Sequence, residues 1–115
     1  MLDINMEFRK GVLFVRLCGE LTKDTVSYLN KEVTERIRLN GIRNVVFNVE
    51  ELDYIDLKGV HSLFYNYEIC HKQKGKTLLC GLHDNLVSKR IKKSRLLRYI
   101  TPLESELNAF GLVKI

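Results

Sequence analysis

The sequence predicts an α/β fold with a mixed, mostly parallel sheet, an opening hairpin and about four helices. Three observations carry this prediction. Strand-like runs alternate with helical patterns after the first two runs, which is typical of right-handed β–α–β crossovers. Gly11 separates the first two strand-like runs, as a hairpin requires. Residues 44–49 are apolar almost throughout, which indicates a strand buried on both faces of a parallel sheet.

The first half of the chain supplies the hairpin and one helix. Residues 2–8 alternate weakly, and residues 12–18 predict a well buried second strand. Thr22 is expected to cap the helix that follows, because its hydroxyl can accept a free backbone N–H of the first turn. The inward face of that helix repeats at helical spacing, with Val26, Leu29, Val33 and Ile37. Asn40 and Gly41 predict its end.

The middle of the chain contains the stretch around which the rest is organised. The central strand, residues 44–49, leads into an acidic loop and then to Asp56. Asp56 is predicted to be the N-cap of the second helix. That helix carries an apolar stripe at spacings of three and four residues, formed by Val60, Leu63, Phe64 and Tyr67.

The last third predicts a strand at residues 77–82 and a short helix capped by Asp84 or Asn85, followed by a final strand at 99–101. The short helix is expected to turn Leu86, Val87 and Ile91 inward. Pro102 is expected to interrupt the last strand. Residues 103–110 predict a terminal helix, and Gly111 stops it.

Length and composition indicate an ordinary folded protein. A chain of 115 residues, 45% hydrophobic and 29% charged, fits a single domain spanning residues 1–115. The longest apolar run is too short to span a bilayer, and residues 1–4 do not resemble a signal peptide. We therefore expect a cytoplasmic protein without stable membrane insertion, and a monomer or weak dimer.

Cysteine and histidine placement gives little support for a metal site. The three cysteines, Cys18, Cys70 and Cys80, are expected to be buried small hydrophobic residues. A metal site would have to recruit His71 and His83 to Cys70 and Cys80 without a C-x2-C arm. We expect no metal and no cofactor.

Catalytic and nucleic-acid signatures are missing from the sequence. It contains no phosphate-binding glycine loop, zinc-protease or nucleophile-elbow motif, so we expect no enzyme activity. Asp53 and Asp56 could be paired carboxylates, but a loop residue beside a helix cap is the commoner arrangement. The net charge of +5 and the basic run at residues 89–98 suit an acidic partner or a solvated helix face. They do not form a nucleic-acid module, and we expect no nucleic-acid partner.

Two stretches of the chain resemble a known family. Residues 12–21, reading VLFVRLCGEL, and residues 42–60, which contain LDYIDLKGV, resemble the STAS domains of sporulation-type anti-sigma-factor antagonists. The resemblance covers about residues 2–112 and implies the same α/β fold. It implies regulation of transcription, in which the antagonist binds an anti-sigma factor that is also a serine kinase.

This chain departs from the family signature at the two central positions of that signature. Family members read Asp-Ser-Ser-Gly or Asp-Ser-Thr-Gly, and the kinase phosphorylates the first hydroxyl residue to break the complex. Asp56 and Gly59 match, but Leu57 and Lys58 replace the two hydroxyl residues. The resemblance therefore implies an antagonist that is not switched by phosphorylation at the usual position. The nearest other hydroxyls belong to Tyr54 and Ser62.

The expected partner-binding surface lies where strands end, because the carboxyl ends of parallel strands share one sheet edge. Asp84 and Asn85 would form a further rim. Three questions stay open: whether Asp56 is only a cap, whether Gly59 is needed for close packing, and whether Leu57 faces water. The alternative function is a STAS subunit or scaffold of a transport or signalling complex that binds a small ligand or lipid. The expected binding residues are Asp53, Tyr54, Asp56, Leu57, Lys58, Gly59, Glu20 and Thr22.

Overall fold

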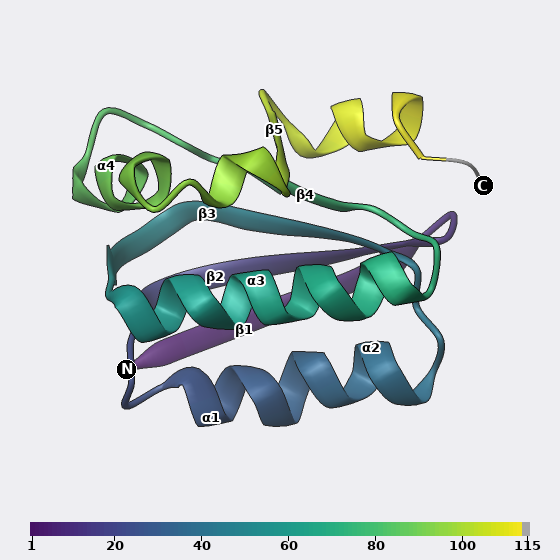
Figure 1. Ribbon diagram of the computed structural model, residues 1–115, viewed down its shortest axis with the longest axis horizontal. Helices are drawn as coiled ribbons and strands as arrows, with labels where there is room; N and C mark the ends of the chain where they lie inside the picture. The colour runs from purple at the N-terminus through teal and green to yellow at the C-terminus, as the bar shows by residue number, and fades with distance from the viewer. Residues whose placement is uncertain (114–115) are drawn as a thin grey trace.

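One five-stranded sheet forms the centre of the molecule in the computed structural model, which describes residues 1–113 (Figure 1). The strand order follows the chain. The first pair is antiparallel and the others are parallel, which confirms the predicted mixed sheet with an opening hairpin. The strands are β1 (Leu2–Arg9), β2 (Val12–Leu21), β3 (Asn44–Ile55), β4 (Thr77–Cys80) and β5 (Thr101–Leu103).

The hairpin turn is made by the two residues between β1 and β2. Lys10 and Gly11 have φ values of 49° and 81°. Positive φ at both central residues is characteristic of the turn whose twist matches that of the flanking strands. As a result β1 and β2 pair in unbroken register, from Leu2 opposite Gly19 to Arg9 opposite Val12.

The longer helices lie on one face of the sheet, with α3 beside the first helical stretch (Figure 1). The first stretch is continuous but changes pitch, because a π-helical segment separates two α-helical parts. The helical segments are α1 (Val26–Leu29), η1 (Asn30–Thr34), α2 (Glu35–Leu39), α3 (Leu57–Lys72), α4 (Leu86–Lys93) and the 3-10 turns η2 (Leu96–Arg98) and η3 (Glu106–Gly111).

Alternation along the strands divides the core into two layers. On the helix side, Leu13 and Val15 of β2 and Phe47 of β3 pack under the long helices. On the opposite side, Phe14 and its neighbours pack against η3. That smaller cluster contains Val12, Phe14, Val46, Leu78, Cys80, Ala109 and Val113.

The strands β2 and β3 are longer than predicted. Where an acidic loop was expected after residue 49, β3 continues to Ile55, with Leu52 and Ile55 buried. This stretch stays extended because β2 runs beside it as far as Leu21, with two register shifts on the way. The acidic residues point outward from a strand and do not mark its end.

Helix boundaries and burial also differ from prediction in several places. The helix predicted to begin after Thr22 begins at Val26, because residues 23–25 form a turn in which the N–H groups of Thr25 and Val26 donate to the Thr22 carbonyl. Strand β4 ends at Cys80, two residues early, where Gly81 turns the chain with a φ of 88°. Leu86 is exposed at the start of α4, so its predicted inward orientation is wrong.

The C-terminal part differs from prediction because its strand lies at the sheet edge. Pro102 sits within β5 and does not interrupt it. An edge strand tolerates proline, since one side of it needs no ladder hydrogen bond. The terminal helix is a 3-10 turn that begins at Glu106, and Leu107 on it is exposed.

The three cysteines divide into two environments. Cys70 and Cys80 are buried as predicted, and burial raises the pKa of the Cys80 thiol to about 11. Cys18 is exposed, against prediction, because it lies on the strand face that η3 leaves uncovered. Within residues 1–113, no helix combines the length and apolar character needed to cross a membrane.

Candidate functional site

The candidate site forms where β2 and β3 end side by side and the chain enters α3. Glu20 lies opposite Tyr54, and Leu21 opposite Ile55, in the parallel register. The backbone N–H of Asp56 donates to the carbonyl of Leu21 at 3.2 Å. The two strand ends therefore hold the start of α3 against the loop that follows β2.

Asp56 links the two loops through its carboxylate. One oxygen accepts the Gly59 N–H at 2.8 Å, which confirms the predicted N-cap, and the other accepts the Lys23 N–H at 3.0 Å. Burial raises the pKa of Asp56, but the backbone N–H groups and the charge of Lys23 outweigh it, so the pKa lies below its ordinary value. Asp56 is therefore a cap whose second oxygen also positions the neighbouring loop.

Gly59 is required by close packing. A Cβ atom at this position would collide with the backbone carbonyl of Leu21 and with the Ile55 side chain. The first turn of α3 thus sits directly on the end of β2. Of the two explanations left open by the sequence, close backbone approach is the one the structure supports.

Leu57 and Lys58 stand free at the first turn of α3. Leu57 is 65% exposed, which answers the question of its orientation, and Lys58 is also exposed. A groove of about 220 Å³ opens beside Leu57 between α3 and α4. Its lining is mostly apolar and includes two cationic side chains and one carboxylate. The lining residues are Asp56, Leu57, Val60, Arg90, Lys93 and Ser94.

Arg90 and Lys93 are site residues that the sequence analysis treated only as part of a basic run. Arg90 lies over the Tyr54 ring at 4.9 Å and donates to the carbonyl of Ile55 at 3.3 Å, so it ties α4 to the end of β3. The spacing of three residues between Arg90 and Lys93, which places them on one helix face, was the available signal. Their tertiary neighbours could not be deduced from the sequence.

Ser62, the first serine that follows the signature position on α3, is enclosed. It is 5% exposed and its hydroxyl donates to the carbonyl of Gly59 at 2.7 Å. The Ser62 carbonyl accepts from Asn66, whose side-chain oxygen accepts the Thr34 hydroxyl at 2.9 Å. These buried hydrogen bonds join α3 to the π-helical segment, and the proton of the Ser62 hydroxyl is used in the bond to Gly59.

The predicted binding residues are not equally close to the groove. Glu20, Thr22 and Tyr54 lie beside the start of α3, and Asp53 is exposed on the outer part of β3. Asp84 and Asn85, expected to form a further rim, directly precede α4, and the residues of α4 that line the groove are Arg90 and Lys93. Asn85 is occupied as the N-cap of that helix, where its side chain accepts the Ser88 N–H at 2.9 Å.

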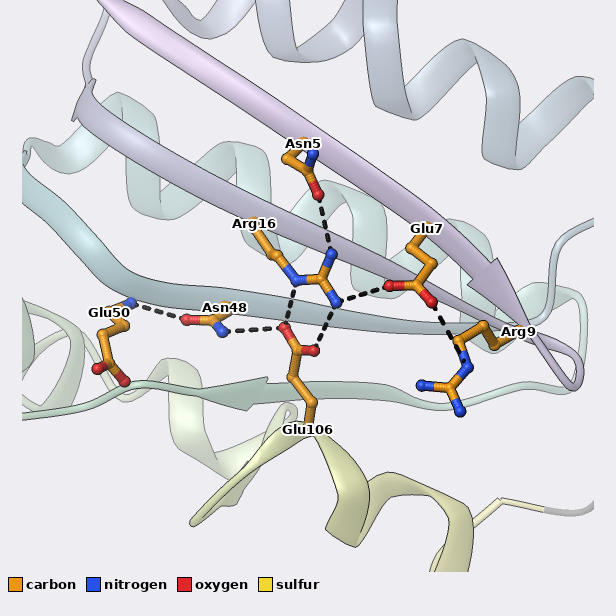
Figure 2. Close-up of polar contacts among 7 residues, drawn as sticks. All are labelled: Asn5, Glu7, Arg9, Arg16, Asn48, Glu50 and Glu106. Atoms are coloured by element: carbon orange, nitrogen blue, oxygen red, sulfur yellow. Dashed lines mark hydrogen bonds and ion pairs between the residues drawn. The ribbon is translucent and has the colours of Figure 1, made fainter.

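A second polar cluster lies on the sheet face opposite the long helices (Figure 2). The Arg16 guanidinium contacts both carboxylate oxygens of Glu106, at 2.8 and 2.9 Å, and also Glu7 and Asn5. Hydrogen bonding to Arg16 lowers the pKa of Glu106, which also accepts from Asn48 at 2.9 Å. The Arg16 guanidinium thus donates to three side chains of the same chain, and the cluster fastens η3 to the sheet.

Metal-binding side chains do not converge at either cluster. Residues 1–113 contain no group of three His, Cys, Asp or Glu side chains placed to hold a metal ion. Cys70 and Cys80, which the metal alternative would have used, are instead buried in different core layers.

Comparisons with known proteins agree on one family. The profile described as "STAS domain" matches residues 3–109. An anti-sigma F factor antagonist of Paenibacillus polymyxa is 27% identical over 114 residues, which is 99% of this chain and 97% of that protein.

Solved structures share the fold at low sequence identity. An anti-sigma factor antagonist from Mycobacterium paratuberculosis superposes with a TM-score of 0.85 at 17% identity, covering 98% of this chain and 94% of that one. The Bacillus cell fate determinant SpoIIAA in its phosphorylated form gives a TM-score of 0.73 at 20% identity, covering 96% and 98%.

Proposed function

Because this chain belongs to the STAS domain family, we propose that it acts as an anti-sigma-factor antagonist that regulates transcription by binding an anti-sigma factor. It is a binding protein and not an enzyme in this proposal. The anti-sigma factor would also be a serine kinase, as the family resemblance implies. The P. polymyxa relative, named an anti-sigma F factor antagonist, supports this class of partner.

The observation that carries the proposal is the exposed Leu57 at a rigidly held helix start. Asp56 and Gly59 fix the first turn of α3 against β2, so the backbone that carries Leu57 is held in place. An exposed leucine beside an apolar groove can anchor a partner side chain, and a preorganised surface loses less entropy on binding. Arg90 and Lys93, which line the same groove, favour an acidic residue next to that anchor.

The proposed regulator is not switched off by phosphorylation at residue 57. Leucine has no hydroxyl, and the residue after it is Lys58. Ser62 does not substitute for the missing acceptor, because its hydroxyl is buried and bonded to Gly59. The complex with the anti-sigma factor would therefore persist under conditions that dissociate a family member carrying serine at this position.

The test is native mass spectrometry of this protein with an anti-sigma kinase from the same genome and ATP. We expect a stable complex and no phosphate on this chain. Leu57→Ser should gain phosphate and leave the complex, because it restores the acceptor hydroxyl at the capped helix start. Absence of any complex would refute the antagonist function. Phosphate on the unaltered chain, with loss of binding, would refute only the missing switch.

A second candidate function rests on the same groove. Its mostly apolar lining, with Arg90 and Lys93, also suits a small amphipathic anion, such as the head of a lipid within a transport or signalling complex. Isothermal titration with short-chain phosphatidic acid separates the two functions. Saturable binding of phosphatidic acid, weakened by Arg90→Ala and by Lys93→Ala, would favour the ligand-binding function. A titration without heat of binding would count against it.

A further inference from the structure

The two edges of the sheet are built differently. At one edge, β5 has three residues and contains Pro102, which blocks continued pairing. At the other edge, β1 has eight residues, no proline and a regular register with β2. An edge strand offers alternate backbone N–H and C=O groups to a further strand. Only the β1 edge keeps the length and regularity that such pairing needs.

The charges of β1 complement a second copy of the same strand. When two copies of a strand pair antiparallel about a twofold axis, one central residue faces its own copy, and residues equally far before and after it face each other. Facing side chains lie on the same sheet face, so each possible register is named by its central residue. Centred on Met6, the register sets Asp3 opposite Arg9 of the second copy, twice. Opposite charges face each other at both ends, and Arg9, which lies 3.5 Å from Glu7 of its own chain, would then lie between two carboxylates. Asn5 faces Glu7, and the Asn5 amide N–H can donate to that carboxylate.

The neighbouring registers lack this match. Centred on Asn5, the register sets Asp3 against Glu7 of the second copy, and both are acidic. Centred on Glu7, it sets two Glu7 carboxylates against each other. Like charges directly opposite are destabilising, so both neighbouring registers are disfavoured. A register centred on Phe8 would also set Glu7 opposite Arg9, but it would pair only residues 7–9 of β1. The register centred on Met6 pairs residues 3–9 and is therefore selected by charge and length of overlap together.

The helix-side face of β1 gives the same register an apolar row. Ile4 would face Phe8 of the second copy, and the two Met6 side chains would meet at the centre. Phe8 is 59% exposed in the single chain. A groove of about 580 Å³ adjoins this edge, and its lining includes Met6, Phe8, Leu13 and Ile42. Pairing would shield apolar surface that one copy leaves in water.

We propose that two copies of this chain form a twofold dimer by antiparallel pairing of their β1 strands, centred on Met6. The two sheets then join into one continuous sheet. The groove beside Leu57 lies at the ends of β2 and β3 and against α4, away from the β1 ladder. Each copy therefore keeps its candidate site free, and the dimer would hold two partners.

The test is sedimentation velocity across protein concentrations up to millimolar. The unaltered protein should show a monomer–dimer equilibrium. Asp3→Arg alone and Arg9→Asp alone should each weaken it about tenfold or more, because each change acts at both symmetric contacts. The combined charge swap should restore dimerisation, since it recreates both pairs in reverse. A protein that stays monomeric throughout, or a dimer unaffected by these changes, would overturn the proposal.

A cross-linking experiment covers the possibility that a charge variant folds poorly. In a Cys18→Ser background, Met6→Cys should form a disulfide-linked dimer under mild oxidation, because the two residues face each other about 5 Å apart. Phe8→Cys is the matched control, since its two copies would lie about 13 Å apart along the strands. Linking of Phe8→Cys and not of Met6→Cys would contradict the register. Both experiments omit the anti-sigma factor, so they can fail without affecting the proposed function.

Discussion

The molecule contains two polar clusters, each built around one charged residue and each joining distant parts of the chain. Arg16 joins β1, β2, β3 and η3 on the exposed sheet face, and its guanidinium is surrounded by acceptors from the same chain (Figure 2). Asp56 joins β2, β3 and α3, and its carboxylate is likewise satisfied by backbone N–H groups. The clusters differ in what surrounds the charge.

Around Arg16 the neighbouring groups neutralise one another, so the cluster is closed. Around Asp56 the cap is satisfied, but Leu57 and Lys58 stand exposed beside it, and Arg90 and Lys93 border an apolar groove. The difference indicates that a compensated charge network fastens a structure, whereas apolar and cationic groups left free at a rigid turn are available to a partner. The predictions below test that distinction.

The largest expected effect belongs to Gly59→Ala at the base of the open site. The added methyl would collide with the Leu21 backbone, which cannot move without disturbing the end of β2. We expect a loss of about 3 kcal/mol in the free energy of unfolding, measured by urea denaturation. Gly111→Ala is the control, because its Cβ would meet no atom within 4 Å. Equal, small effects at both positions would contradict the close-packing account.

Next in size is Arg16→Ala in the closed cluster. Removing the guanidinium leaves the partly buried Glu106 without its main partner, and we expect a loss of about 2 kcal/mol in unfolding free energy. Partner binding should not change. Arg38→Ala removes an exposed ion pair with Glu35 and should cost about 0.5 kcal/mol or less. If Arg16→Ala weakened binding of the anti-sigma factor, the Arg16 cluster would not be purely structural, and the distinction between the two clusters would be wrong.

Asp56→Ala should have a smaller and pH-dependent effect. At neutral pH we expect the free energy of unfolding to fall by about 1 kcal/mol through loss of the cap. The pKa of Asp56 is lowered in the folded state, so its contribution is complete above the ordinary aspartate pKa and is lost as pH falls through the folded value. The difference in free energy of unfolding between the unaltered protein and Asp56→Ala should therefore become smaller below about pH 4.

Asp56→Asn provides the control for that pH dependence. Asparagine can still cap the helix but cannot titrate, so the stability gap between Asp56→Asn and Asp56→Ala should stay constant with pH. Chemical denaturation at several pH values measures all three proteins. A gap between the unaltered protein and Asp56→Ala that widens in acid would contradict the direction of the pKa shift.

The smallest expected effect is on thiol reactivity. Cys18 is exposed and should react with iodoacetamide in the folded protein, while Cys80 stays protected by η3 and by its raised pKa. Mass spectrometry of digested protein locates the label. Arg16→Ala should increase labelling of Cys80, because the contact that holds η3 is lost. Unchanged protection of Cys80 would mean that the Arg16 cluster does not fasten this segment.

Local features of the fold were predictable, and features that depend on tertiary neighbours were not. The Asp56 cap and the Gly11 hairpin depend on residues within a few positions of each other, so the sequence reveals them directly. The continuation of β3 to Ile55 depends on β2 lying beside it, and Pro102 is tolerated in β5 only because that strand is at the edge. Neither neighbour is visible in the local pattern.

The candidate site shows the same division. Leu57 and Gly59 were identified from the chain itself, because they stand where the family signature places a hydroxyl and a glycine. Arg90 lies 36 residues from Tyr54 and 35 from Ile55 in sequence, and only the fold brings its guanidinium to the Tyr54 ring and the Ile55 carbonyl. Cys18 was misjudged for the related reason that exposure of one sheet face depends on how much of it η3 covers.

The central claim is that the open turn at Leu57 is the binding surface. The most direct test compares Leu57→Asp with Leu107→Asp by titrating each against the anti-sigma factor. The two leucines are 65% and 69% exposed, so the substitutions perturb the fold to a similar, small extent. We predict that Leu57→Asp weakens binding about a hundredfold and that Leu107→Asp leaves it unchanged. Equal affinities for the two variants would contradict the account.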